Sequence, residues 1–523
     1  MSGGGGDLGV DGGVSIDGHS LRLAQIVRVA RAGAAVSIDP RAFGAMEDSR
    51  RVVVETLRTG RPVYGINTGF GRLSEVAIPS SQLRKLQLNL ILSHAAGVGP
   101  ELEADQVRAA MLLRANALAK GYSGVRPALV QLIVECLNRD VVPVVPSQGS
   151  LGASGDLAPL AHISLVLVGR GEAVVGGRRL PGGEALRQAG LEPQVLEAKE
   201  GLALINGTQV LTAVGALALW DAMTTIDAAD VAAAMTMEAL AGLREAMDPR
   251  LHAARGHPGQ IATAQRILAL LEGSGLAGRA GTRVQDAYSL RCIPQVHGAV
   301  RDALGFVADV LGREFNAATD NPLVFAAGQD PGQAASPEVV SGGNFHGHPV
   351  AIALDLAAVA LCGISNISER RIERLVNPDL SGLPAFLTRS GGLESGLMIA
   401  HYTAAALASE NKLLASPASV DTIPTSANQE DHVSMGAAAA RKLARVVAQT
   451  RTIVAIELLA AAQAVELRAE QDGLPSPPAG MGRGTVTAYA ALRELVPGLG
   501  HDRELAPDIA AAAGLVRAGR FSA

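Results

Sequence analysis

Apolar residues recur at helical spacing over most of the chain. In segments of about 15 to 40 residues they fall three and four positions apart, and the alternation of apolar and polar residues that marks β-strands is rare. The pattern therefore predicts a mainly α-helical protein with long helices. The predicted helical segments are 102–139, 208–246, 258–273, 296–313, 347–375, 398–415 and 435–472.

Two of these segments, 208–220 and 350–363, are apolar around almost their whole circumference. A helix without a polar face is normally covered by other helices or by another subunit. We therefore expect a large bundle of long, nearly parallel helices in a protein that associates with itself.

The helical pattern is interrupted at 140–200 and again at 316–349. In the first interruption Pro, Gly and Val gather in VVPVVPSQGSLGASGD and GEAVVGGRRLPGG, which is typical of loops and a short hairpin. We see neither a repeat of fixed period nor a clear linker. The sequence favours a smaller mixed N-terminal part over 15–200, followed by a long-helix bundle and C-terminal helices over 201–523.

Composition narrows the class of protein. The chain has 523 residues, 48% of them apolar, and 45 Lys and Arg nearly balance 50 Asp and Glu. Aromatic residues make up only 3%, so neither a basic surface nor a set of stacking aromatics points to nucleic acid. Cys136, Cys292 and Cys362 form no CxxC pair, which argues against a disulfide framework or a cysteine zinc site and favours a reducing compartment.

The N-terminal sequence MSGGGGDLGVDGG lacks the basic and apolar regions of a secretory signal, so residues 1–14 are expected to be a flexible tail. The most apolar stretches are interrupted by Asp355 and Glu457 and fall short of the roughly 18 apolar residues that a membrane span needs. We expect a cytoplasmic protein with no membrane partner.

The segment GSLGASGD, residues 149–156, admits three interpretations. It is no P-loop, because no Lys follows the glycines, and no nucleophile elbow, because Asp156 stands where a GxSxG motif around Ser154 needs Gly. The simplest interpretation of so short a motif is a glycine-rich connection. The third is chemical: in a tight bend the nitrogen of Gly155, which lacks a Cβ, can attack the carbonyl carbon of Ala153. Loss of that oxygen and of the Ser154 hydroxyl as two waters would leave an electrophilic ring with an exocyclic methylene.

This segment, with Gln148 before it and DLAPL after it, resembles the signature of the histidine and aromatic amino acid ammonia-lyases. The resemblance runs from about residue 15 to about residue 470 through blocks in the same order. These are YGINTGFG (64–71), LSHAAGVG (92–99), KEGLALINGTQ (199–209), VQDAYSLRCIPQVHG (284–298), NAATDNPL (316–323), SGGNFHG (341–347), ERRIERLVNP (369–378), ASENK (408–412) and SANQEDHVSM (426–435).

The resemblance implies a prosthetic group, 4-methylidene-imidazol-5-one (MIO), made from Ala153, Ser154 and Gly155 without a metal or a nucleotide. It also implies a homotetramer whose active sites combine residues from three subunits. Composition agrees with this only loosely, through the helices that are apolar on all sides.

Deamination of an amino acid needs a base for a weakly acidic β-proton, a grip on the carboxylate and a better leaving group at nitrogen. By resemblance, Tyr64 is a lid residue that acts as acid or base, although a Tyr often only packs. Asn206 would contact the ring and the substrate, the alternative being an ordinary polar residue that caps a helix. Phe345 is expected to line the pocket.

Tyr288 and Arg291 lie three positions apart, so on a helix they share one face. Arg291 suits a bidentate grip on the α-carboxylate better than a lysine would, the alternative being a surface salt bridge. Tyr288 is a second candidate base, and Gln285 is expected to support it. The sequence leaves the base open among Tyr64, Tyr288 and Glu430, and leaves open whether the ring takes up the amine, which we prefer, or the imidazole.

Two positions favour L-histidine as the substrate. Ser93-His94 resembles the histidine-specific branch, where phenylalanine-specific relatives tend to carry Phe-Leu, and Glu430 stands where aromatic ammonia-lyases usually have Gln. A carboxylate can accept a hydrogen bond from an imidazole N–H, whereas beside a phenyl ring it would be an unpaired charge. The expected reaction gives trans-urocanate and ammonia. The alternatives are a tyrosine or phenylalanine ammonia-lyase, an aminomutase, or a helical oligomer without activity.

His346 and His348 form the one possible metal pair that we identify in the sequence. Two histidines without a third ligand at regular spacing are a weak signal, and the ring chemistry needs no metal. We therefore predict a site without a metal.

Overall fold

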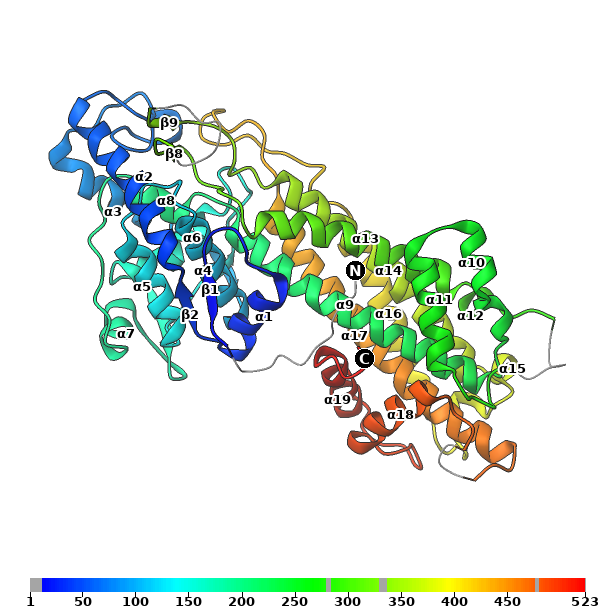
Figure 1. Cartoon of the computed structure of the whole chain (residues 1–523). Helices are drawn as coiled ribbons and strands as arrows, with labels where there is room; N and C mark the ends of the chain where they lie inside the picture. Colours follow the sequence, from blue (N-terminus) through cyan, green and yellow to red (C-terminus); the bar gives the residue numbers. More distant parts are fainter. Residues whose placement is uncertain (1–11, 279–283, 329–335, 476–478, 523) are drawn as a thin grey trace.

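Four long helices form the axis of the molecule: α9 (Gln209–Ala239), α13 (Ile293–Glu314), α14 (His348–Val376) and α17 (Gly436–Gln471). The computed structural model describes residues 12–278, 284–328, 336–475 and 479–522, and helices predominate among them. Figure 1 shows the four helices side by side and nearly parallel, and α17 packs against both α9 and α14. The expected mainly α-helical fold with a bundle of long helices is confirmed.

The apolar circumference of α9 is explained by its position. Every residue from Gln209 to Leu219 is buried, because α4 (Ala104–Ala119), α13, α14 and α17 surround it. Among the described residues, α9 and α14 are long and apolar enough to cross a membrane, but 89% and 61% of their most apolar windows are buried inside the chain. Burial of this kind is also found in helices of an ordinary protein core.

The N-terminal part is mixed. Two short parallel strands, β1 (Val14–Ile16) and β2 (Val36–Ile38), lie beside α1 (Leu23–Ala32). The hairpin expected within 140–200 is β6 (Glu172–Val175) with β7 (Arg178–Pro181). The boundary that we expect at residue 200 stays a prediction, and residues 1–11 of the expected tail lie outside the described residues.

The sequence was wrong about two local details. The segment 102–139 is two helices, α4 and α5 (Pro127–Asn138), because Gly121 (φ 84°) and Gly124 (φ 66°) adopt left-handed conformations between them. The segment 140–200, expected to hold loops and a hairpin, also contains α6 (Leu157–Leu167) and α7 (Gly182–Gln188). A short apolar run such as LAPLAHISLVL has no periodicity that identifies it as a helix.

The remaining elements connect these parts or pack against the bundle. They are α2 (Pro40–Thr59), α3 (Leu83–His94), β3 (Val98–Glu101), β4 (Val142–Pro143), β5 (Pro146–Gln148), α8 (Glu200–Ile205), α10 (Pro249–Arg255), α11 (Pro258–Leu270), α12 (Tyr288–Arg291), β8 (Leu323–Phe325), β9 (Glu338–Val340), α15 (Pro378–Ser381), α16 (Met398–Leu414), α18 (Arg483–Leu495) and α19 (Ala506–Arg517), with short 3-10 turns at Gly71–Leu73, Ser80–Gln82, Arg244–Met247 and Ala385–Leu387. Among those that pack against the bundle, α11 contacts α13, and α16 contacts α14 and α17.

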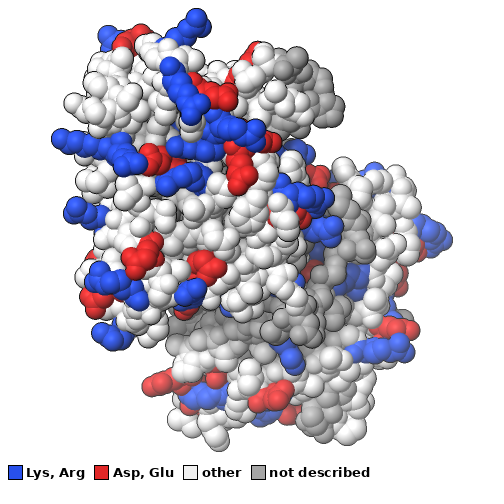
Figure 2. Space-filling model, turned by 60° about the vertical axis from the view of Figure 1, so that its left-hand side comes forward, with Lys and Arg blue, Asp and Glu red and all other residues white. Residues whose placement is uncertain are grey.

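On the face shown in Figure 2, basic side chains lie among acidic ones. Exposed ion pairs account for part of such mixing: Arg179 contacts both Glu101 at 2.7 Å and Glu172 at 2.6 Å. Pairs this exposed contribute about 0–1 kcal/mol each, so the fold rests on the buried bundle rather than on them.

Candidate active site

The glycine-rich loop between β5 and α6 folds back on itself. Gly152 and Ala153 both pair with Gly155 through the main chain, and Gly155 has a left-handed φ of 71°. The loop also pairs with the segment before α9, because Gly207 donates its N–H to the Ser154 carbonyl at 3.3 Å. The backbone therefore has the tight bend in which the nitrogen of Gly155 lies close to the preceding residues.

Asp156 fastens this loop to the start of α9. Its carboxylate accepts hydrogen bonds from the main-chain N–H of Leu211 at 2.8 Å and from the hydroxyl of Ser150 at 3.2 Å. Burial raises the pKa of Asp156 to about 7, against the lowering effect of these hydrogen bonds. The N-terminus of α9, where unpaired N–H groups point outward, is a favourable place for such a carboxylate.

Gly155 cannot carry a side chain here. A Cβ at this position would overlap the carbonyl of Gly207 and lie 2.9 Å from its Cα, and these neighbours are main-chain atoms that cannot swing away. Gly155→Ala should therefore lower the free energy of unfolding by about 2–5 kcal/mol, combining left-handed conformation with overpacking.

The matched control for this substitution is Gly176→Ala, at a glycine with φ 57° and no atom within 4 Å of the added Cβ. It should cost only the conformational part, about 1–2 kcal/mol. Thermal unfolding of both variants measures the difference, and equal losses would contradict the close packing of Gly155 against Gly207.

Asn206 lies at the end of α8, 2% exposed, in a buried polar network. Its Nδ2 donates to Asp320 Oδ1 at 3.3 Å and to the Asn321 carbonyl at 3.0 Å. Because both partners are acceptors, they fix which end of the amide faces them. Asn206 Oδ1 consequently points elsewhere, and it has no hydrogen-bond partner among the residues that the structure describes. It is a free, buried acceptor next to Gly207 and the glycine-rich loop.

Two buried cations, Lys199 and Arg114, offset the negative charge of Asp320 beside Asn206. Lys199 forms an ion pair with Asp320, both at most 1% exposed, and Arg114 donates to the Asn206 carbonyl at 2.9 Å. Burial lowers the pKa of Lys199, against the opposing pull of Asp320, and lowers the pKa of Arg114 to about 10. The Asp320 carboxylate therefore both holds the Asn206 amide and compensates buried positive charge.

Asp320→Ala should be strongly destabilising, by about 3–5 kcal/mol, because it leaves the Lys199 ammonium buried without its partner. Glu101→Ala removes a carboxylate from an exposed pair with Arg179 and should cost at most about 1 kcal/mol. Thermal unfolding of the two variants tests the contrast. If Asp320→Ala unfolded at the wild-type temperature, the ion pair of Lys199 with Asp320 would contribute nothing to stability.

Tyr64 and Glu430 belong to two loops that meet. The N–H of Arg72 donates to the hydroxyl of Ser426 at 3.4 Å, which joins the 64–71 loop to the 426–435 segment. Burial raises the pKa of Tyr64, and the charges of Glu430 and Asp320 add to that rise. Tyr64, Glu430 and Asp320 are therefore close enough to influence one another.

The loop that carries Glu430 is held by its own contacts. Thr425 donates its N–H to the Glu430 carbonyl at 2.9 Å and its hydroxyl to Glu430 Oε2 at 3.0 Å. Between them Ser426, Ala427 and Asn428 have φ values of 52°, 53° and 66°, a left-handed run that costs energy in residues with a side chain. The loop is thus fixed in a tight conformation that sets the position of the carboxylate.

His94 ends α3 and faces the same region. Its Nδ1 lies 2.8 Å from the Leu90 carbonyl, which can only accept, so Nδ1 carries the proton and Nε2 is the acceptor. Burial lowers the pKa of His94, against the opposing charge of Glu430. His94 is therefore a neutral imidazole that offers one acceptor nitrogen.

Phe345 lies just before α14, two residues from Gly347. A Cβ on Gly347 would contact Ser434 and Leu211, and Met435 donates to the Leu151 carbonyl at 2.9 Å, so this segment borders the glycine-rich loop.

His346 and His348, the possible metal pair in the sequence, lie near a third histidine, because the His432 ring lies 5.5 Å and 5.7 Å from their rings. Among the described residues no group of three His, Cys, Asp or Glu is arranged to hold a metal ion. The metal-free site stays a prediction.

Tyr288, Gln285 and Arg291 lie elsewhere in the chain. Arg291 donates to Gln285 Oε1 at 2.5 Å and its guanidinium lies 4.5 Å from the centre of the Tyr288 ring. In Figure 1 α12, the helix of Tyr288 and Arg291, is at the opposite end of the bundle from α6 and α8. Within one chain Asn206 lies beside the glycine-rich loop through Gly207, and Tyr64 and His94 are both near the Glu430 charge. The structure does not bring α12 to that region.

A model of the aromatic amino acid lyase family matches residues 21–494. The chain belongs to the aromatic amino acid lyase family. This lyase is 56% identical to the histidine ammonia-lyase of Symbiobacterium thermophilum, over 97% of each chain. Its fold is similar to that of the histidine ammonia-lyase from Trypanosoma cruzi (44% identity, TM-score 0.88, 97% of this lyase and 94% of that chain). It is also similar to a tyrosine aminomutase from Streptomyces globisporus (38% identity, TM-score 0.90, 98% of each chain).

Sequence analysis missed the support that surrounds Asn206 in this lyase. Lys199 and Asp320 stand in blocks that carry the family resemblance. Their opposite charges among small and apolar residues could have indicated a buried ion pair. The two residues are 121 positions apart, however, and no spacing rule pairs residues at that separation.

Proposed function

We propose that this lyase removes ammonia from L-histidine and releases trans-urocanate, with MIO formed from Ala153, Ser154 and Gly155. The choice of L-histidine rests on Glu430. Its carboxylate lies on a constrained loop, and its charge acts on both Tyr64 and His94. A carboxylate there suits an imidazole N–H and would be an uncompensated charge beside a phenyl ring.

The glycine-rich loop fits the formation of MIO. The backbone already doubles back at Gly155, which has room for hydrogen only, and Asp156 and Gly207 hold the bend from both sides. In the reaction the nitrogen of Gly155 bonds to the carbonyl carbon of Ala153, whose oxygen leaves as water. Ser154 then loses its Cα hydrogen and its hydroxyl as a second water. The finished ring supplies an electrophilic methylene that activates the amino acid for loss of ammonia.

The side chains around the loop divide the remaining tasks. His94 Nε2 and the Glu430 carboxylate offer two acceptors, which match the two N–H groups of a substrate imidazolium. Asn206 Oδ1, buried and without a partner in the described chain, is a suitable acceptor for the substrate ammonium. Tyr64 is a candidate acid or base on the adjoining loop.

Supplying L-histidine, L-tyrosine and L-phenylalanine in turn tests the assignment, because urocanate and the cinnamates absorb at different wavelengths. Turnover of L-histidine alone is the expected outcome, and treatment with borohydride should abolish it. Turnover of L-tyrosine or L-phenylalanine without L-histidine would overturn the choice of substrate. The absence of any turnover, together with a chain mass that equals the sequence, would favour a helical oligomer without activity.

We also propose a cytoplasmic homotetramer with shared active sites. Within a chain, α12, which carries Arg291, lies at the opposite end of the bundle from α6, which follows the glycine-rich loop (Figure 1), so a carboxylate grip by Arg291 requires another copy. The exposed side chains Ile352, Leu356 and Val359 recur on one face of α14, which is otherwise a core helix. An apolar stripe of this kind is suited to packing against a second helical subunit.

Co-expression of Ser154→Ala and Arg291→Gln chains should restore deamination that neither variant shows alone. Mixed assemblies would contain sites that combine an intact loop from one chain with an intact Arg291 from another. Assays of the purified mixed assembly against each single variant measure this. Persistent inactivity of mixed tetramers would mean that each chain completes its own site.

A further inference from the structure

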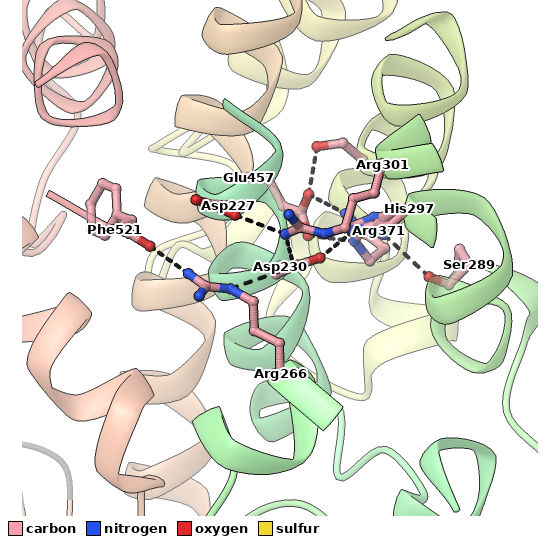
Figure 3. A network of polar contacts seen from close by, with 10 residues as sticks. Asp227, Asp230, Arg266, Ser289, His297, Arg301, Arg371, Glu457 and Phe521 are labelled. Carbon is pink, nitrogen blue, oxygen red and sulfur yellow. Dashed lines mark hydrogen bonds and ion pairs between the residues drawn. The ribbon is translucent and has the colours of Figure 1, made fainter. Parts of the chain in front are cut away.

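A buried ion network joins the four long helices of the bundle and reaches α12, away from the glycine-rich loop. Figure 3 shows its members converging from separate helices: Asp230 on α9, His297 and Arg301 on α13, Arg371 on α14 and Glu457 on α17. His297, Asp230, Arg371 and Glu457 have fully buried side chains. Such networks are a weak source of stability, because desolvation of the charges offsets their attraction.

Arg371 has a partner at each of its three guanidinium nitrogens. Its Nε and Nη2 donate to the two carboxylate oxygens of Glu457, the second at 2.9 Å, in a bidentate pair. Its Nη1 lies 3.4 Å from His297 Nε2 and 3.5 Å from the main-chain carbonyl of Ser289. The guanidinium therefore joins the core of the bundle to a carbonyl of the short helix α12.

The position of Nη1 is set by the residues behind it. The His297 Nδ1 lies 2.6 Å from Asp230, which can only accept, so Nε2 is left as an acceptor for Arg371. Burial lowers the pKa of His297, against the charge of Asp230. Glu457 is fixed in turn by the hydroxyl groups of Thr236, at 3.0 Å, and Ser368.

Ser289 lies between the two functional side chains of α12. Tyr288 precedes it and Arg291 follows two residues later, and the two side chains stack on each other at 4.5 Å. A helix of four residues has little stability of its own, so α12 depends on its link to α13 through Cys292 and on the contacts of Ser289 and Leu290. Leu290 is fully buried and supplies the apolar part of that anchor.

We infer that Arg371, clamped by Glu457 and His297, is a positioning residue that sets α12 and thereby aims Arg291 at the substrate carboxylate and Tyr288 at the reacting carbon. The inference rests on the proposed function of Arg291 and Tyr288. A displacement of α12 by about 1 Å is enough to matter, because misplacement of that size costs up to about 100-fold in rate.

The test compares Arg371→Lys with Arg266→Lys. Lysine keeps the charge but cannot pair with both oxygens of Glu457 and still reach Ser289. Arg266 belongs to the same network, through Asp230 at 3.5 Å and the Phe521 carbonyl at 2.7 Å, and Figure 3 shows it on the side of the network away from Ser289. Both chains should still lose two waters, since the glycine-rich loop lies at the other end of the bundle. Arg371→Lys should raise KM for L-histidine about tenfold, and Arg266→Lys should leave it within about twofold.

A double-variant cycle separates positioning from general damage. If Arg371 acts through Arg291, then adding Arg371→Lys to an Arg291→Gln chain should raise KM little further, because the two effects are not additive. Additive effects, an unchanged KM in Arg371→Lys, or an equal rise in Arg266→Lys would each overturn the inference.

Hydrogen exchange of the amides in α12 provides a readout without activity, and these amides should exchange faster in Arg371→Lys than in Arg266→Lys. A wild-type chain that fails to deaminate L-histidine would refute the proposed function. The exchange comparison would still decide whether Arg371 holds α12, and equal exchange in the two variants would overturn that.

Discussion

Ser154→Ala is expected to keep the chain from losing two waters and to lower deamination of L-histidine by at least about 10³-fold. Alanine can still follow the bend of the loop, but it has no hydroxyl to leave as the second water, so the methylene cannot form. Without that electrophile the reaction loses the main source of a rate enhancement that in enzymes is usually at least about 10⁶-fold. Intact-chain mass and urocanate absorbance measure the two effects on the same sample.

The control for this variant is Ser164→Ala, in the adjoining helix α6, where the hydroxyl donates to the Leu160 carbonyl at 2.7 Å. It removes the same atom from a buried serine and should preserve both the loss of two waters and turnover. A Ser154→Ala chain that was lighter by two waters, or that turned over normally, would refute a prosthetic ring made from residues 153–155.

The long helices were predictable from the sequence because their signal is local. Apolar residues at helical spacing gave α11, α14, α16 and α17 to within a few residues, since each helix buries a face along its whole length. The break between α4 and α5 was not recognised, because both sides of it are apolar and only Gly121, Gly124 and Pro127 mark it. An apolar pattern that continues across a break does not show where one helix ends and the next begins.

The sequence indicated candidate site residues but not how the fold arranges them. The motif and the family blocks indicated Tyr64, His94, Asn206 and Glu430; the structure places Asn206 beside the glycine-rich loop through Gly207, and Tyr64 and His94 near the Glu430 charge. The same blocks indicated Arg291, yet its helix, α12, lies at the opposite end of the bundle from α6 and α8 (Figure 1). Sequence order carries no information on how far apart two such blocks lie in the folded chain.

The support behind these residues was missed for a related reason. The pair of Lys199 with Asp320 and the pair of Arg371 with Glu457 each join segments far apart in the chain. A charged residue within an apolar pattern signals that a partner exists, because an unpaired buried charge is costly. It does not identify the partner, which only the packed fold reveals.

Glu430→Gln is expected to lower kcat/KM for L-histidine by about 5- to 15-fold while the loss of two waters from the chain remains complete. The substitution keeps the shape and one acceptor oxygen, but it replaces a charge-assisted hydrogen bond to the imidazole by a neutral one, a difference of about 1–1.5 kcal/mol. Activity on L-phenylalanine or L-tyrosine, if any is present, should not fall, because no imidazole N–H is involved. Steady-state assays with the three amino acids measure the change in preference.

Asp431→Asn is the matched control, since Asp431 is the exposed neighbour and loses the same charge. The pH profile distinguishes the two variants further. The charge of Glu430 raises the pKa of Tyr64 and that of His94, so its removal should lower both, and any limb of the profile set by either group should move to lower pH. An equal loss in Asp431→Asn, or an unshifted profile with full activity in Glu430→Gln, would mean that this carboxylate does not face the substrate imidazole, and the argument for L-histidine over an aromatic substrate would lose its structural basis.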